Sequence, residues 1–70
     1  MTVAYRHIPP APRDLLDEVY TREGAETWWN SGNRLFRSPQ GVPRRPVDLW
    51  AEGEQDVVMQ VLEMLADGNF

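Results

Sequence analysis

Near the end of the chain, apolar side chains recur at the spacing of one helical face, and no other pattern in the sequence limits the possible folds so strongly. The five residues of this stripe are Val57, Val58, Val61, Leu62 and Leu65. Spacings of three and four residues are typical of an amphipathic helix that buries one side. Glu54 and Asp56 lie where acids stabilise a first helical turn, and Gly68 lies where a helix cap belongs. The sequence therefore predicts a closing helix that packs against other elements.

Three earlier segments also favour helices. Residues 12–22 place their apolar side chains on one face, and residues 46–52 begin with a proline that fits a first helical turn. Residues 23–31 form a further helical segment that ends at Gly32, which tolerates a left-handed stop. Whether the chain breaks near Gly24 or continues from the segment before it is open. No segment alternates like a strand, so we expect an all-α domain of three to four short helices.

The opening residues differ from the rest in their proline content. Pro9 and Pro10 push the residues before them out of the helical region, so residues 1–11 are expected to form an extended arm. Residues 12–70 are expected to form a single helical domain. Two interpretations of the arm are open: a frayed terminus, or a strap laid across a partner.

The chain lacks the usual means of stabilising a small domain. A chain of 70 residues buries about 60% of the surface that it exposes when unfolded, so its core is thin. It has no cysteine for disulfides or thiolate zinc sites, and His7 is its sole histidine. Hydrophobic residues make up 41% of the chain and include three tryptophans, which argues against disorder. Association with another chain is the remaining remedy.

The charges are unevenly distributed. The net charge is −4, and all seven basic residues are arginines. Four of them fall in the expected loop between residues 34 and 45, namely Arg34, Arg37, Arg44 and Arg45. An acidic chain disfavours nonspecific nucleic-acid binding, although the basic loop suits an acidic patch on a partner. The sequence has neither an apolar run long enough for a membrane span nor a secretory signal, so a cytoplasmic location is expected.

The residue types argue against catalysis. The chain has no cysteine and no lysine, and its histidine lies in the proline-rich arm, where nothing preorganises it. The glycines are scattered singly and form no phosphate-binding loop. The acids of the closing helix fit a solvated face better than a catalytic pair. We therefore expect no enzyme activity, no cofactor and no metal site.

The second half of the chain carries a series of short motifs in a fixed order. They are Ala25-x-x-Trp28-Trp29, Asn33-x-Leu35, Arg45-Pro46-Val47-Asp48-Leu49, Gly53-x-x-Asp56-x-Val58 and Leu62-x-x-Leu65-x-x-Gly68-x-Phe70. This order resembles the toxin-binding domain of the Xre/MbcA/ParS antitoxins. The chain departs from the family pattern at Gly32, where a proline is usual, at Trp29, where a leucine is usual, and in its longer and more basic loop.

The resemblance implies a dimeric helical module that binds a RES-domain toxin, an NAD-degrading enzyme, and blocks access to its active site. Only 24 residues precede Ala25, too few for the family's upstream helix-turn-helix region, so we expect that DNA-binding region to be lacking. A homodimer or a hetero-complex with the toxin is expected, without membrane or nucleic-acid partners.

Candidate site residues fall into two sets. Residues expected to contact a partner are Trp29, Asn33, Arg34, Arg44, Arg45, Met59 and Phe70. Residues expected in the core are Trp28, Leu35, Leu49, Val58, Val61, Leu62 and Leu65. For Trp29 and Phe70 a core position is an alternative, and for Arg44 and Arg45 a solvated position. Tryptophan and arginine are common at interface hot spots, which supports the partner-contact set.

Three hypotheses follow. The first is an antitoxin that neutralises a toxin stoichiometrically, including a stand-alone or phage-borne form that binds a host toxin. The second is a regulatory adaptor or small transcription cofactor that uses the basic loop. The third is a self-assembling structural piece such as a phage component.

Overall fold

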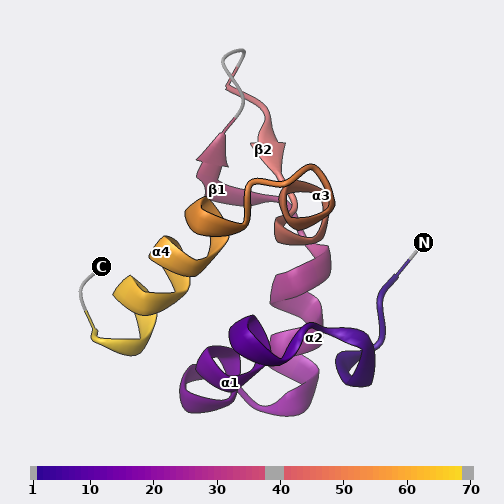
Figure 1. The fold of residues 1–70 in the computed structure, drawn as a ribbon, viewed down its shortest axis with the longest axis vertical. Coiled ribbons are helices and arrows are strands. Elements are labelled where there is room, and N and C mark those ends of the chain that lie inside the picture. The colour runs from indigo at the N-terminus through magenta and orange to yellow at the C-terminus, as the bar shows by residue number, and fades with distance from the viewer. Residues whose placement is uncertain (1, 38–40, 69–70) are drawn as a thin grey trace.

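The computed structural model describes residues 2–37 and 41–68, which form a small helical body with a hairpin projecting from it (Figure 1). The elements in order are a 3-10 turn (Tyr5–His7), α1 (Pro10–Val19), α2 (Arg22–Asn30), β1 (Asn33–Arg37), β2 (Pro43–Arg44), α3 (Pro46–Ala51) and α4 (Gln55–Ala66). The expectation of a mostly helical domain with three to four short helices is confirmed. The two short strands are an addition that the sequence pattern did not predict.

The break between α1 and α2 lies earlier than Gly24. Helix α1 begins at Pro10, two residues before the predicted start, because a proline in the first turn loses no helical hydrogen bond. It ends at Val19, and Tyr20 is extended. Thr21 then caps α2, its Oγ1 accepting a hydrogen bond from the N–H of Gly24 at 3.1 Å. Gly24 therefore lies inside the first turn of α2.

Strands β1 and β2 form an antiparallel hairpin where a loop was predicted. Asn33 pairs with Arg44, and Arg37 pairs with Pro43. The two paired residues are four positions apart in β1 but adjacent in β2, so the register between the strands is irregular. This irregular register bends the hairpin. The expected left-handed stop at Gly32 is wrong, because α2 leaves through an extended Ser31 directly into β1.

Helices α3 and α4 follow the predicted pattern closely. Gly53 and Gly68 have φ values of +90° and +74°, the left-handed conformation that glycine adopts without strain. Gly53 follows the end of α3, and Gly68 follows the end of α4. Helix α4 packs against both α1 and α3, so the last helix of the chain closes over the first.

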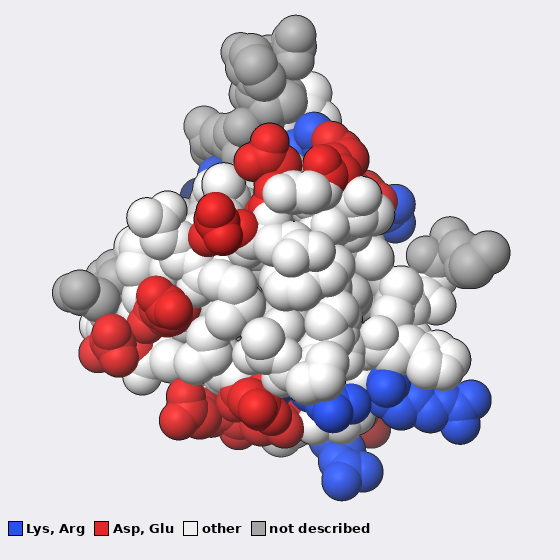
Figure 2. Space-filling model, in the orientation of Figure 1, with Lys and Arg blue, Asp and Glu red and all other residues white. Residues whose placement is uncertain are grey.

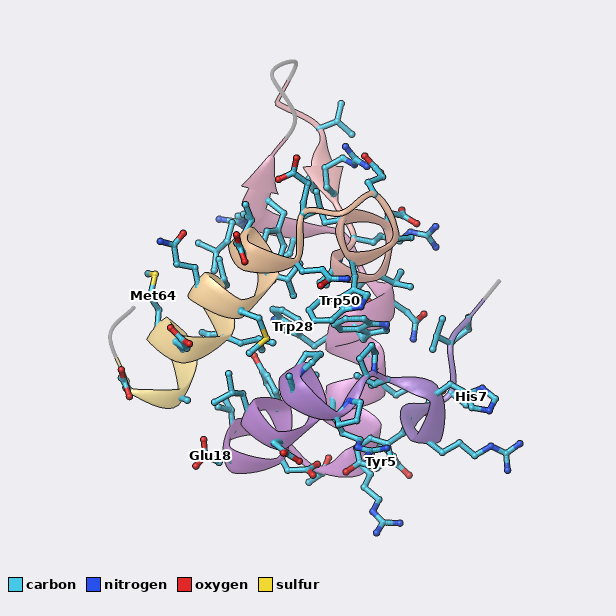
Figure 3. The ribbon with its side chains drawn as sticks, in the orientation of Figure 1. Tyr5, His7, Glu18, Trp28, Trp50 and Met64 are labelled. Atoms are coloured by element: carbon cyan, nitrogen blue, oxygen red, sulfur yellow. The ribbon has the colours of Figure 1, made fainter. Side chains whose placement is uncertain are left out.

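The core lies between the helices and the inner face of the hairpin. Its buried residues are Ile8, Leu16, Ala25, Trp29, Phe36, Val58, Val61 and Leu62. Aromatic contacts link the elements: the ring centroids of Trp29 and Trp50 are 5.7 Å apart, and those of Trp28 and Phe36 are 5.8 Å apart. Figure 3 shows Trp28 and Trp50 directed into the space between the helices.

The residues before α1 pack on their own domain. Ile8 is 1% exposed and belongs to the core. The side-chain amide of Asn30 accepts a hydrogen bond from the N–H of Val3 at 2.8 Å and donates one to the carbonyl oxygen of Val3 at 2.9 Å. The hydroxyl of Tyr5 donates to Asp17 of α1. These contacts contradict the interpretation of the arm as a frayed terminus, whereas the strap across a partner stays a prediction.

Candidate protein interface

The hairpin carries the most exposed large apolar side chains of the described residues. Leu35 on β1 is 52% exposed, and Val42 just before β2 is 56% exposed. Neighbouring residues of a strand point to opposite faces, so the burial of Phe36 in the core directs Leu35 outward. The prediction that Leu35 is a core residue is therefore wrong. Exposed aliphatic groups on a projecting element are typical of a binding surface.

Two arginines predicted to meet a partner form ion pairs within the chain, where the hairpin meets α3. The guanidinium of Arg45 donates from Nε to Oδ2 of Asp48 at 2.8 Å and from Nη2 to Oδ1 at 2.9 Å. Arg44 of β2 forms an ion pair with Glu52 just after α3. The hydrogen bonds from Arg45 hold the pKa of Asp48 below its ordinary value, although burial opposes them. Within the hairpin, Arg34 is the predicted cation left exposed.

The other predicted partner residues have different locations. Trp29 is 2% exposed, so its predicted partner contact is corrected to the core position left open as its alternative. Asn33 is half-buried, and its Oδ1 accepts a hydrogen bond from the N–H of Leu35 at 2.9 Å, which fixes the start of β1. Met59 is half-buried against the core. Phe70 lies outside the described residues. Of the predicted set, the structure brings Asn33, Arg34, Arg44 and Arg45 together at the hairpin and its junction with α3.

The residues expected in the core lie mainly on the inner side of the helices. Val58, Val61 and Leu62 of α4 are buried. Trp28, Leu49 and Leu65 are partly buried and pack against them. Val42 was missed, because a single valine between Gly41 and Pro43 gives no periodic signal.

The body beneath the hairpin has an acidic margin. Figure 2 shows acidic side chains around the junction of α3 and α4 and again along α4 and α1, with uncharged surface between them. No helix among residues 2–37 and 41–68 has the length and apolar character needed to cross a bilayer. In the same residues no three His, Cys, Asp or Glu side chains are grouped to hold a metal ion.

The chain is similar in sequence to mycobacterial antitoxins. It is 37% identical over 57 residues to the mycobacterial cidal antitoxin MbcA from two strains of Mycobacterium tuberculosis and one of Mycobacterium bovis. The alignment covers 81% of this chain but 46% of the antitoxin, so the chain spans about half the length of these relatives. No model of a known protein family matches the chain, and no solved structure matches it. The similarity supports the antitoxin relationship that the motif order indicates.

Proposed function

We propose that this chain is an antitoxin-like protein that binds a partner toxin and inhibits it by contact, without catalysis of its own. The similarity to MbcA antitoxins is the observation that carries this proposal. The toxin class implied by the family resemblance is the RES-domain type, which degrades NAD. We further propose that the protein acts in the cytoplasm, as a homodimer or within the toxin complex.

We assign the hairpin as the contact element for the toxin. Leu35 and Val42 keep about half of their surface in water, and covering apolar surface contributes about 25 cal/mol per Å2. The ion pair of Arg44 in β2 with Glu52, just after α3, restrains the hairpin relative to the helical body. A preoriented element loses less conformational entropy on binding than a flexible loop does.

Co-expression with a RES-domain toxin encoded beside this gene tests the function. We expect the protein to restore growth of cells that express the toxin and to co-purify with it. If the protein neither restores growth nor co-purifies with the toxin, the proposal is contradicted. A capsid or tail gene cluster around the gene, together with an extended array in light scattering, would favour a self-assembling structural protein instead.

Variants of the hairpin test the assigned surface separately. The double substitution Leu35→Asp with Val42→Asp is expected to weaken toxin binding by about tenfold or more, because two apolar contacts are replaced by charges. Tyr20→Gln changes another exposed apolar residue, 36% exposed and located at the end of α1, and serves as the matched control. Circular dichroism establishes that both variants fold. Equal binding by the two variants would place the interface elsewhere and leave the antitoxin proposal intact.

A further inference from the structure

Two arginines that are distant in sequence, Arg13 and Arg22, lie over the ring of one tyrosine, and a third arginine follows that tyrosine in the chain. Arg6 lies in the 3-10 turn, Arg13 in the first turns of α1, and Arg22 at the start of α2. The ring of Tyr5 lies under the guanidinium groups of Arg13 and Arg22, and its hydroxyl donates a hydrogen bond to Asp17. Figure 3 shows Tyr5 at the end of the body away from the hairpin, and Figure 2 shows basic side chains gathered there. We call Arg6, Arg13 and Arg22 the arginine cluster.

Two of these guanidinium groups are held by the tyrosine ring. The central guanidinium carbon of Arg13 is 6.0 Å from the ring centroid, and that of Arg22 is 5.4 Å from it. Both distances lie in the range of cation–π attraction. Arg13 Nη1 also donates to the carbonyl oxygen of Arg6 at 3.4 Å. The planar guanidinium groups of Arg13 and Arg22 are therefore oriented by contacts within the chain before any ligand binds.

The arginine cluster keeps its charge available to a ligand. Within residues 2–37 and 41–68, Arg44 and Arg45 form ion pairs with carboxylates, whereas the arginine cluster forms none. Arg6 and Arg22 are exposed, and Arg13 is partly so. Among the described residues of a chain of net charge −4, these three arginines form no ion pair with a carboxylate, although Asp17 lies close by as the acceptor of the Tyr5 hydroxyl.

We propose that the arginine cluster is a second docking surface, which binds an acidic segment of a protein partner. A guanidinium fork matches a carboxylate with two parallel hydrogen bonds, and two forks held by one ring suit closely spaced carboxylates. This surface lies away from the hairpin, so the proposal is independent of toxin binding there. The protein thus has one apolar contact element and one cationic one.

The surroundings of the arginine cluster favour an acidic protein segment over nucleic acid. Asp14 and Glu18 of α1 are exposed, and Figure 2 shows acidic side chains directly beside the basic ones along this edge. A nucleic-acid strand carries a phosphate at every step and would meet this repulsion as it extends along α1. A short acidic segment can contact the guanidinium groups of Arg13 and Arg22 without running along α1 past Asp14 and Glu18.

Fluorescence anisotropy with a labelled Glu-rich peptide tests the proposal at low salt. The full chain is expected to bind the peptide, and Arg13→Gln with Arg22→Gln to weaken binding by about tenfold or more. Arg34→Gln removes an exposed arginine from the hairpin and is expected to leave binding within about twofold of the unmodified chain. Tyr5→Leu leaves every charge in place but removes the ring, so a loss of affinity there reports orientation of the forks.

The same titrations can overturn the proposal. No binding of the Glu-rich peptide, or an equal loss in the Arg34→Gln variant, contradicts a specific cationic site. Tighter binding of a DNA oligonucleotide of equal charge replaces the acidic segment with nucleic acid. Undiminished binding by the Arg13→Lys and Arg22→Lys double variant contradicts the role of the forks, because lysine keeps the charge without the planar geometry. Circular dichroism establishes that each variant is folded.

Discussion

Trp29 is the largest fully buried side chain in the described part of the protein. It is nearly inaccessible to solvent, and its contact with Trp50 joins α2 to α3. The neighbouring Trp28 packs edge-on against Phe36 and so connects the same helix to the hairpin. Two successive residues of α2 therefore hold two different elements. Because they are about 100° apart around the helix axis, each reaches a different neighbour.

Substitution of Trp29 by alanine is expected to unfold the domain. Loss of a buried tryptophan costs about 3–5 kcal/mol, which is comparable to the entire stability of a domain this small. Leu35→Ala removes an exposed side chain and is expected to change stability by less than about 0.5 kcal/mol. Urea unfolding followed by circular dichroism measures both. A larger effect at Leu35 than at Trp29 would contradict the assigned burial.

The Asp48–Arg45 pair is expected to give a small acid dependence of stability. The pKa of Asp48 is lowered, so its contribution is present above about pH 4 and is lost as the pH falls through the pKa of the folded state. Asp48→Asn should cost less than about 1 kcal/mol near pH 7, since the pair is partly exposed. Its difference from the unmodified chain in urea titrations should shrink toward about pH 3. A constant difference would show that the charge is not the cause.

At the scale of elements, α2 depends on how it begins. The helix spans Arg22–Asn30 and is short enough that its packing and its cap decide whether it forms. The Thr21 hydroxyl satisfies one of the amide groups that every helix leaves unpaired at its start. The same residue sets the turn between α1 and α2.

Removal of that cap should destabilise the protein measurably. Thr21→Ala is expected to cost about 1 kcal/mol, because the N–H of Gly24 loses its acceptor. Thr27→Ala makes the same chemical change on the exposed side of the same helix and is expected to be neutral or slightly stabilising. Thermal unfolding of the two variants compares them directly. Equal effects would contradict a specific capping role.

The helices were predictable from the sequence, whereas the hairpin was not. Helix α4 has a five-residue apolar stripe that only a helix brings to one side, and α3 begins at a proline. Strand β2 has two residues, one of them Pro43, and its register with β1 is irregular, so no alternation develops. The exposure of Leu35 follows from the pairing of β1 with β2, so it could not be predicted from the sequence either. The pairing of Arg45 with Asp48 is local, but a charge pattern alone does not distinguish an internal pair from a partner contact.

At the scale of the whole molecule, the two ends of the chain complete one interior. Ile8 precedes the first helix and lies in the same core as Val58 and Leu62 of the last. The burial of Ile8 was not predictable from the sequence, because one isoleucine before two prolines has no periodic apolar neighbours. The packing of α1 against α4 then brings the first and last helices into contact.

Deletion of the N-terminal residues is therefore expected to unfold the body. A chain that starts at Pro9 lacks Ile8, and loss of a buried isoleucine side chain costs about 2–5 kcal/mol. A chain that starts at Tyr5 keeps Ile8 and loses the contact between Val3 and Asn30, so it should remain folded with reduced stability. Dispersion of amide signals in NMR spectra distinguishes the two states. A well-folded chain from Pro9 would contradict this role of Ile8.

The hydrogen bonds between Asn30 and Val3 have a practical consequence. The side-chain amide imitates the backbone of a neighbouring strand, since it both donates to and accepts from the same residue. Any tether, label or upstream polypeptide joined ahead of Thr2 therefore leaves the surface at a defined position beside α2. Figure 1 places this point at the side of the body, apart from the hairpin. Immobilisation through the N-terminus should accordingly leave Leu35 and Val42 open to an incoming molecule.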